Sequence, residues 1–230
     1  MATAALAGST GQVGSNILSQ LLTHPSFSSV YAYTRRELPN PTAATKLHPL
    51  SSTDTSTWAS MFPRSPAPAV FFSGLGTTMK QAGSFEAQYK IDYDLNLELA
   101  KAAKDAGVET YVLISSSNAS SQSRFAYVQM KGKLEDDVAA LGFKHTVFVQ
   151  PGLIIGERRP EDKRPAEFAL QSVAKLFRSV TPKLTDFWAQ DSATIARAAV
   201  AAGVQCVEGK REAEGVWRLG QAEINALGKP

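Results

Sequence analysis

Cysteine is almost absent from this 230-residue chain, in which Cys206 is the only one. A single thiol excludes an internal disulfide and a cysteine-based metal cluster, and it fits a reducing compartment. Histidine is also scarce: His24, His48 and His145 are scattered without the spacing of metal ligands. We therefore expect no metal centre.

Strong charge and long hydrophobic runs are missing too. The 24 basic and 21 acidic side chains leave a net charge of +3, too small and too dispersed to favour nucleic-acid binding. No apolar run approaches the roughly 18 residues of a membrane-spanning helix. The first apolar run begins at Ala2, which predicts that there is no cleavable presequence. Any membrane contact is expected to be peripheral.

The sequence does contain a regular alternation of strand-like and helix-like segments. Strands are expected at residues 2–7, Val30–Thr34, Lys46–Leu50, Ala69–Ser73, Thr110–Ser115 and His145–Val149. Helical periods lie at Val13–Leu22, Ala87–Ala106 and Tyr127–Leu141. This order predicts an α/β fold in a single domain, with the doubly wound parallel sheet of the Rossmann fold.

Two parts of the chain depart from this regularity. The segment Pro39–Pro68 is rich in Pro, Ser and Thr and predicts loops, one weak strand and a short helix around Trp58. Residues 1–150 are expected to form the cofactor-binding core, and residues 151–230 a small substrate-side and C-terminal elaboration. In that elaboration we expect helices at Ala166–Arg178 and Ser192–Ala202, a strand at Val216–Leu219 and a terminal helix.

A glycine-rich turn joins the first expected strand to the first expected helix. It reads Gly8-Ser9-Thr10-Gly11-Gln12-Val13-Gly14. Glycines at this spacing let the backbone turn tightly and approach a pyrophosphate, which then lies on the N–H groups of the helix. The turn therefore predicts a dinucleotide site. The alternative is that the three glycines serve only the turn.

The end of the second strand indicates which dinucleotide is bound. NAD sites place Asp or Glu about 20 residues after the glycines to bind the ribose 2′-hydroxyl. Here Arg35 and Arg36 follow Thr34, and no acid comes before Glu37. A guanidinium holds a phosphate bidentately, so the sequence favours NADP(H). The alternative is a solvated arginine pair at a strand end.

Groups able to transfer a proton follow the fifth strand. Ser115, Ser116 and Ser117 end that strand, and Tyr127 and Lys131 share one face of the next helix because they are four residues apart. A nearby ammonium favours tyrosinate, so Lys131 is expected to lower the pKa of Tyr127. A serine hydroxyl at the strand end would orient a substrate carbonyl. The alternative is a packed ring beside a solvated amine.

Together these motifs resemble the short-chain dehydrogenase/reductase superfamily. The likeness extends from residue 2 to about Leu227, and the motifs that carry it are Gly8, Gly11 and Gly14, Thr34-Arg35-Arg36, Gly74-Leu75-Gly76-Thr77-Thr78, Ala106-Gly107-Val108, Ser115-Ser116, Tyr127 with Lys131, Pro151-Gly152 and Gly156-Glu157-Arg158. Within the superfamily, the chain is most similar to the atypical branch of fungal mitochondrial outer-membrane NAD(P)-binding (Fmp-type) proteins and animal Tat-interacting oxidoreductase-like proteins.

The resemblance implies a role for each matching residue. Ser116 would polarise the carbonyl, with Ser115 and Ser117 as near alternatives. Tyr127 would be the general acid/base, and Lys131 would bind the nicotinamide ribose and tune Tyr127. The remaining cofactor-binding residues would be those of the glycine turn, Arg35 and Arg36, and then Gly74, Leu75, Gly76, Thr77 and Pro151.

Two positions depart from the superfamily's pattern. Gln150 stands where many members have Arg before Pro-Gly, which removes a fixed charge near the cofactor. Asp92 stands where better-known reductases have an Asn that completes a proton relay. These departures put proton relay in doubt and leave the binding fold unaffected.

Two functions fit the sequence, and both use NADP(H). The first is an oxidoreductase that transfers hydride to or from a small carbonyl or alcohol substrate. The second is a non-catalytic NADP(H)-sensing protein that controls association with a partner or a membrane surface. The expected aromatic substrate wall, with the protein core as its alternative, consists of Phe168, Phe177, Phe187 and Trp188.

The resemblance also implies a location. It suggests the cytosolic face of the mitochondrial outer membrane, with a cytoplasmic protein as the alternative. The basic residues expected to contact the membrane, unless they are simply solvated, are Arg158, Arg159, Lys163 and Arg164. The sequence predicts no particular oligomeric state.

Overall fold

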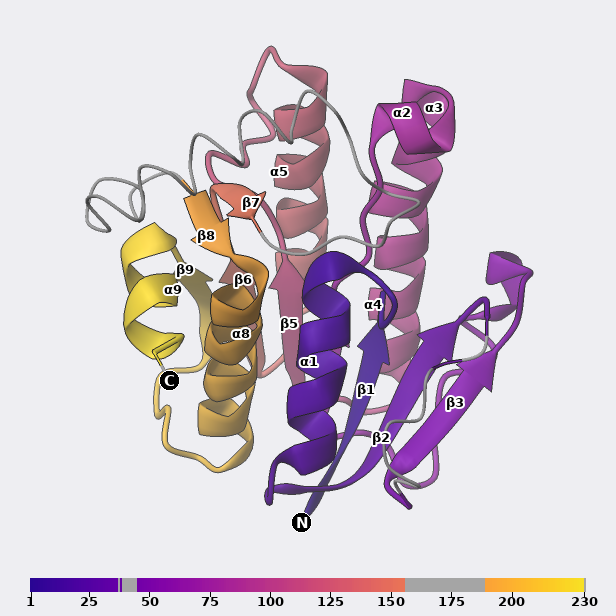
Figure 1. Ribbon diagram of the computed structural model, residues 1–230, viewed down its shortest axis with the longest axis vertical. Coiled ribbons are helices and arrows are strands. Elements are labelled where there is room, and N and C mark those ends of the chain that lie inside the picture. The colour runs from indigo at the N-terminus through magenta and orange to yellow at the C-terminus, as the bar shows by residue number, and fades with distance from the viewer. Residues whose placement is uncertain (37, 39–44, 156–188, 230) are drawn as a thin grey trace.

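The computed structural model describes residues 1–36, 38, 45–155 and 189–229. Its centre is a seven-stranded sheet in the order β3-β2-β1-β4-β5-β6-β9, in which neighbouring strands are parallel (Figure 1). The strands are β1 (Ala2–Ala7), β2 (Phe27–Thr34), β3 (Leu47–Ser51), β4 (Val70–Ser73), β5 (Thr110–Ile114), β6 (His145–Val149) and β9 (Gly215–Leu219). The predicted doubly wound parallel sheet is therefore confirmed.

The burial of the strands explains their short apolar sequences. Every residue of β4, β5 and β6 is buried, as expected for central parallel strands that are covered on both faces. The edge strand β3 is largely exposed and contains Pro49, which an edge position tolerates because fewer ladder hydrogen bonds form there.

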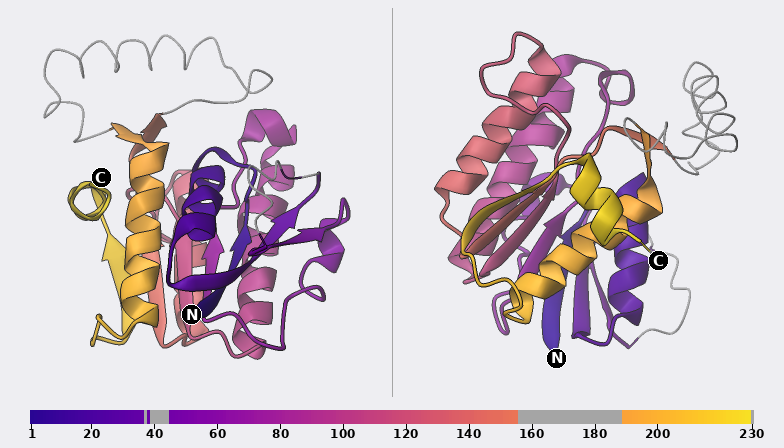
Figure 2. Two further views of the ribbon diagram at one scale, coloured as in Figure 1. Left: turned by 60° about the horizontal axis from the view of Figure 1, so that its bottom comes forward. Right: turned by 90° about the vertical axis from the view of Figure 1, so that its left-hand side faces the viewer.

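Helices cover both faces of the sheet. The helical segments are α1 (Gln12–Thr23), the short 3-10 helix η1 (Thr55–Thr57), α2 (Met79–Ala82), α3 (Phe85–Tyr89), the π-helical segment η2 (Lys90–Leu95), α4 (Asn96–Asp105), α5 (Ala126–Ala140), α8 (Ser192–Val207) and α9 (Gln221–Leu227). Helices α1, α8 and α9 pack on one face, and α4 and α5 on the other (Figure 2). Each face thus has its own hydrophobic core, with Ile17 and Ile195 in one and Leu99 and Leu134 in the other.

The C-terminal part of the chain completes this sheet. Strand β9 pairs with β6, and α8 packs beside α1, although the two helices are far apart in the sequence (Figure 1). The predicted helix at 192–202, the strand at 216–219 and the terminal helix are confirmed. The helix predicted at 166–178 lies outside the described residues.

Two features differ from the expectations. The single helix expected at 87–106 is helical throughout, but it contains the π-helical segment η2, a rare form that is often found at functional sites. A second, two-stranded parallel sheet, β7 (Leu153–Ile155) with β8 (Ala189–Asp191), was not predicted. Its strands are only three residues long, so periodicity gives almost no signal.

Candidate functional site

The glycine turn after β1 lies against the backbone of two other segments. Gly8 has φ +80°, and a Cβ added there would lie 2.5 Å from the carbonyl carbon of Gly74, just after β4. A Cβ added to Gly14 would lie 2.0 Å from the Gly8 carbonyl oxygen. Side chains do not fit at these distances, so both positions require glycine. The tight turn between strand and helix that the glycine spacing predicts is thus present.

The turn delivers the amino end of α1 to the carboxyl edge of the sheet. Gly11 is the N-cap and has no side chain to cap the helix, and the first turn contains no acid. The first amides and the positive end of the helix dipole are therefore suited to an anion. Ser9 does not line the cleft described below: it is buried, and its hydroxyl donates to the Tyr33 carbonyl oxygen at 2.7 Å, which ties the turn to β2.

A cleft of about 590 Å³ opens above this turn, within the usual size range of ligand pockets. The site residues predicted from the sequence that line it are Thr10, Gly11, Gln12, Val13, Gly74, Leu75, Gly76, Thr77, Ser116, Tyr127, Lys131 and Pro151. Gly8 and Gly14 do not line the cleft. Five segments that are far apart in the chain thus meet at one edge of the sheet.

Arg35 and Arg36 lie beside this region and do not line the cleft. They follow Thr34, the last residue of β2, and β2 pairs with β1, so they lie at the same edge of the sheet as Gly8. Both side chains are exposed. The Thr34 side chain and backbone groups of Arg36 hydrogen-bond each other, which shapes the turn that carries the two guanidinium groups.

Ser116, Tyr127 and Lys131 come together in the cleft. Ser116 follows β5, and the other two residues lie one turn apart at the start of α5. The Ser116 side chain lies near enough to the Tyr127 phenol to lower its pKa, and the Ser116 hydroxyl donates to the Ser117 carbonyl oxygen at 3.4 Å. Ser115, one of the alternatives, instead donates its hydroxyl to Glu135 at 2.5 Å. Ser117 is not among the cleft residues, and its amide donates to the Pro151 carbonyl oxygen at 2.8 Å. The geometry favours Ser116.

The pKa of Tyr127 moves opposite to the expectation. The Tyr127 side chain is 42% exposed, and the partial removal of its phenol from water raises this pKa. The charge of Asp92 raises it further, and a hydrogen bond with Ser116 lowers it. Lys131 is not among these causes. The expected lowering of the Tyr127 pKa by Lys131 is therefore wrong for this structure, because loss of water and the Asp92 carboxylate raise this pKa and Lys131 does not contribute to the shift.

Two buried groups of opposite charge lie deeper in the cleft. Lys131 is 2% exposed, and its Nζ lies 3.5 Å from the Ile114 carbonyl oxygen. Burial lowers the pKa of Lys131, while Asp92 and then Glu135 raise it. Asp92, 1% exposed, has a raised pKa because of burial, which Lys131, the Thr77 amide and Gln88 oppose. The Asp92 Oδ1 accepts the Thr77 N–H at 2.6 Å, which fixes the segment after β4.

The loop between β5 and α5 is held tightly against the helix. A Cβ added to Gly132 would lie 2.1 Å from the Ser120 carbonyl carbon, and the Ser120 amide donates to the Val128 carbonyl oxygen at 3.2 Å. Gly132 thus lets α5 approach the loop that carries Ser116. The sequence analysis missed this residue, although a glycine inside a helical pattern signals either instability or close packing.

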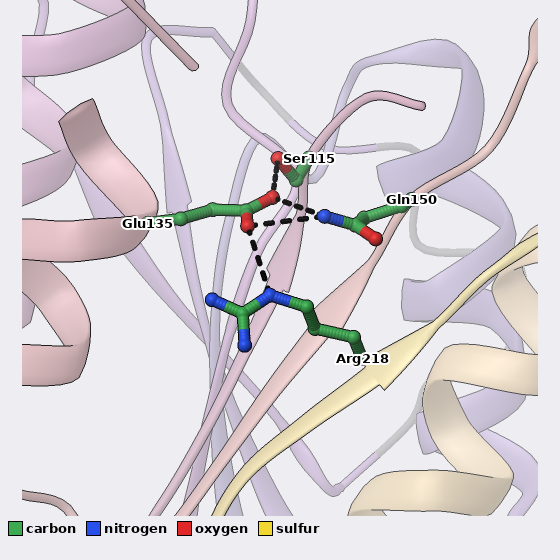
Figure 3. A network of polar contacts seen from close by, with 4 residues as sticks. All are labelled: Ser115, Glu135, Gln150 and Arg218. Atoms are coloured by element: carbon green, nitrogen blue, oxygen red, sulfur yellow. Dashed lines mark hydrogen bonds and ion pairs between the residues drawn. The ribbon is translucent and has the colours of Figure 1, made fainter. Parts of the chain in front are cut away.

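A second missed residue is Glu135, which joins α5 to three strands (Figure 3). Its carboxylate accepts hydrogen bonds from the Ser115 hydroxyl and, at 2.9 and 3.0 Å, from the Gln150 amide. It also forms an ion pair with Arg218 of β9 at 3.5 Å. The sequence analysis considers Gln150 only as the loss of an arginine charge, whereas in the structure its side-chain amide donates hydrogen bonds to the buried Glu135 carboxylate. The available signal was that Glu135 is four residues after Lys131.

The described residues contain neither a candidate metal centre nor a membrane-spanning helix. In residues 1–36, 38, 45–155 and 189–229, no group of three His, Cys, Asp or Glu side chains could hold a metal ion. Within the same residues, no helix is long and apolar enough to cross a membrane. The aromatic residues expected as a substrate wall and the basic residues expected as membrane contacts lie outside this part of the chain.

Comparison with solved structures shows the fold. A short chain dehydrogenase family protein from Francisella tularensis aligns with a TM-score of 0.66 at 12% identity, covering 97% of this chain and 98% of that one. The Bordetella bronchiseptica enzyme WbmH, in complex with NAD⁺, aligns with a TM-score of 0.63 at 14% identity, covering 95% and 75%. These similarities confirm the Rossmann-like architecture of short-chain dehydrogenases.

Sequence comparison shows the family. The HIM1 family model matches residues 45–183. The protein fmp52-1, mitochondrial, of Aspergillus terreus is 49% identical over 234 residues, which cover 100% of both chains. The chain therefore belongs to the HIM1 family and is a relative of the fungal Fmp52 proteins.

Proposed function

We propose that the protein is an NADP(H)-dependent oxidoreductase acting on a small carbonyl or alcohol substrate. One observation carries the proposal: a single cleft brings together the glycine turn, Ser116, Tyr127 and Lys131. A dinucleotide-binding turn alone would fit many functions. A phenol, a hydroxyl and an ammonium gathered beside it are the groups that carbonyl reduction requires.

The residues of the cleft fit a nicotinamide dinucleotide. Gly8, Gly14 and Gly74 form a cradle of closely packed backbone, in which a Cβ at Gly8 or Gly14 would collide with the chain. The uncapped amino end of α1 beside this cradle is suited to an anion such as pyrophosphate. Gly76 and Thr77 would line the adenosine and ribose side. WbmH, one of the structural neighbours, is described in complex with NAD⁺, which supports the same class of cofactor here.

Side chains of the protein would then orient the substrate, transfer the proton and bind the cofactor ribose. The bound cofactor supplies the hydride, a task that no side chain can perform. Ser116 would donate a hydrogen bond to the carbonyl oxygen, and Tyr127 would give that oxygen its proton. The raised pKa of Tyr127 keeps the phenol protonated and so suits the direction of reduction. Lys131, buried beneath, would bind the ribose hydroxyls.

The preference for NADP(H) over NAD(H) rests on Arg35 and Arg36. Both are exposed at the end of β2, beside the turn, where a ribose 2′-phosphate would be met. Residues 1–36 contain no Asp or Glu, so the position after β2 that holds a carboxylate in NAD sites is occupied by Arg35 here, and the first acid in the chain is Glu37. Calorimetric titration with NADPH and NADH tests this preference, and equal affinities would contradict it.

The experiment that tests the activity is oxidation of NADPH against a panel of aldehydes, ketones and quinones. We expect turnover that Lys131→Met abolishes together with NADPH binding, because the lysine would hold the ribose. NADPH binding without turnover on any substrate would contradict the oxidoreductase.

One observation favours a second function, the sensing of NADP(H) without catalysis. The pKa of Tyr127 is raised and Asp92 stands in the cleft, so the tuning expected of a phenol that must also accept protons is missing. A sensor would bind NADPH and change its association with a partner or a membrane when the cofactor is bound. Binding without turnover would be the expected result.

The protein is expected to act as a peripheral protein on the cytosolic face of the mitochondrial outer membrane. The mitochondrial name of the Aspergillus terreus relative supports the mitochondrion as the organelle. Alkaline carbonate should release the protein from isolated mitochondria, and added protease should digest it without rupture of the outer membrane. Protection from the protease would contradict the cytosolic face.

A further inference from the structure

Glu135 is a buried acid that the proposed reaction does not use. It is 3% exposed and lies in α5, four residues after Lys131 and eight after Tyr127, so the three side chains follow one another along one side of the helix. Packing alone would favour an apolar residue at this position, because a buried carboxylate costs desolvation energy unless it is well partnered.

The partners of Glu135 are the kind that an ionised carboxylate needs. Ser115 donates a hydroxyl, Gln150 an amide and Arg218 a guanidinium, and an ionised carboxylate can only accept hydrogen bonds (Figure 3). These three donors come from the ends of β5 and β6 and from β9. The sheet therefore holds a negative charge in a fixed place one helical turn from Lys131.

The charges around Lys131 explain what this carboxylate can do. Burial disfavours the ammonium form, and among the described residues Asp92 from η2 and Glu135 from α5 oppose that effect. Tyr127 lies one turn earlier on the same helix. Arg218 is half-exposed and faces the same carboxylate from β9, where its guanidinium also lies 5.3 Å from the centre of the Phe148 ring. Its positive charge counteracts that of Glu135.

We propose that Glu135 is a positioning residue that keeps the Lys131 ammonium charged, and that Arg218 limits this influence by pairing with the same carboxylate. The value of this arrangement rests on the proposed function, in which Lys131 binds the cofactor ribose. The charge relationship itself needs no cofactor. It can therefore be tested on the protein alone.

The test is a pH titration of Lys131 by NMR on the full chain with isotope-labelled lysine. Its resonance is assigned by its loss in Lys131→Met. Glu135→Gln keeps the size of the side chain, but it removes the charge and replaces one acceptor oxygen with an NH₂ donor. It should lower the midpoint of the Lys131 titration by about 0.5 to 1 pH unit. Asp136→Asn, the same change at the next, exposed position of α5, should leave it in place.

Arg218→Met gives a prediction of opposite sign. Removing the guanidinium leaves the Glu135 charge facing Lys131 with less competition, so the midpoint should rise. Damage to the fold would not move the two variants in opposite directions. Arg218 is half-exposed, so its variant also provides the test if Glu135→Gln does not fold.

Two results would overturn the proposal: an unchanged midpoint in both variants, or an equal shift in Asp136→Asn. NADPH titration of the same wild-type sample separates this outcome from failure of the proposed function. Absent NADPH binding would contradict the oxidoreductase and leave the Lys131 titration valid. Normal NADPH binding with an unchanged midpoint would remove the role of Glu135 alone.

Discussion

The two ends of the parallel sheet carry charged side chains of the same kinds in opposite surroundings. At the carboxyl ends, Lys131, Asp92 and Glu135 are 2%, 1% and 3% exposed. At the amino ends, Lys144 and Glu109 form an ion pair of 3.7 Å whose side chains are 48% and 68% exposed. Water screens the second pair, whereas the first group depends on its neighbours for every compensating interaction.

This difference in burial distinguishes a candidate functional site at the carboxyl ends of the strands from ordinary protein surface at their amino ends. Buried charges are costly, so a fold retains them where their chemistry is used, and perturbed pKa values gather in such places. At the carboxyl end, the pKa values of Tyr127, Asp92 and Lys131 are all shifted, each with burial as the first cause.

The largest effect is expected from removing the phenol oxygen. Tyr127→Phe should leave NADPH affinity nearly unchanged, because the phenol serves the proton step more than cofactor binding. Turnover should fall about 10²- to 10⁴-fold, the contribution of a positioned proton donor. Steady-state kinetics with the matched control Tyr89→Phe, outside the cleft lining, measures this loss. Wild-type turnover in Tyr127→Phe would remove the assigned mechanism.

The next effect concerns the backbone cradle at the carboxyl end. Gly14→Ala should lower the free energy of unfolding by at least about 3 kcal/mol, because the new Cβ would lie 2.0 Å from a backbone oxygen that cannot move aside. Gly76→Ala is the matched control: its nearest atom would be Asp92 Oδ2 at 3.7 Å, and the change should stay within about 0.5 kcal/mol. Urea denaturation compares the two, and equal losses would contradict the cradle.

A smaller effect is expected at the exposed arginines after β2. Arg35→Asp should weaken NADPH binding by roughly 10- to 100-fold, equivalent to about 1.5–3 kcal/mol for one charge-assisted phosphate contact, and leave NADH affinity much less changed. Arg64→Asp makes the same charge change at an exposed position outside the cleft lining. Calorimetry on both variants checks the prediction. If Arg64→Asp had the same effect, Arg35 would have no specific role.

The smallest effect is expected at the amino ends. Lys144→Gln should change the free energy of unfolding by less than about 1 kcal/mol. The ion pair with Glu109 is exposed, and its formation restricts two otherwise mobile side chains, so its net contribution is small. Urea denaturation at low and high salt measures this change. A loss of several kcal/mol would show that the contrast between the two ends of the sheet does not hold.

The local patterns of the chain were predictable because their causes are local. A parallel strand buried on both faces is a short apolar run, and β5 and β6 were found at nearly their predicted bounds. The spacing of Gly8, Gly11 and Gly14 predicts a tight turn because the backbone atoms that crowd Gly11 and Gly14 belong to Gly8, a few residues earlier. Tyr127 and Lys131 share a face because a helix has a fixed period.

Contacts between distant segments were not predictable from these patterns. In the sequence, Glu135 cannot be distinguished from an exposed acid on a helix. Its partners Gln150 and Arg218 come from the end of β6 and from β9, and they reach Glu135 only in the folded protein. The π-helical segment that holds Asp92 has no periodicity of its own in the sequence. The raised pKa of Tyr127 also depends on burial and on Asp92, which a four-residue spacing does not reveal.

The sequence by itself determined the alternation of the main strands and helices, the parallel doubly wound sheet and most of the residues that line the cleft at its carboxyl edge. Hydrophobic periodicity and glycine spacing act between near neighbours, so they can be read along the chain. Only the tertiary structure decided which serine faces Tyr127, which acids surround Lys131 and in which direction the pKa values move. Burial and the distances between charges set these properties, and both exist only once the segments have packed together.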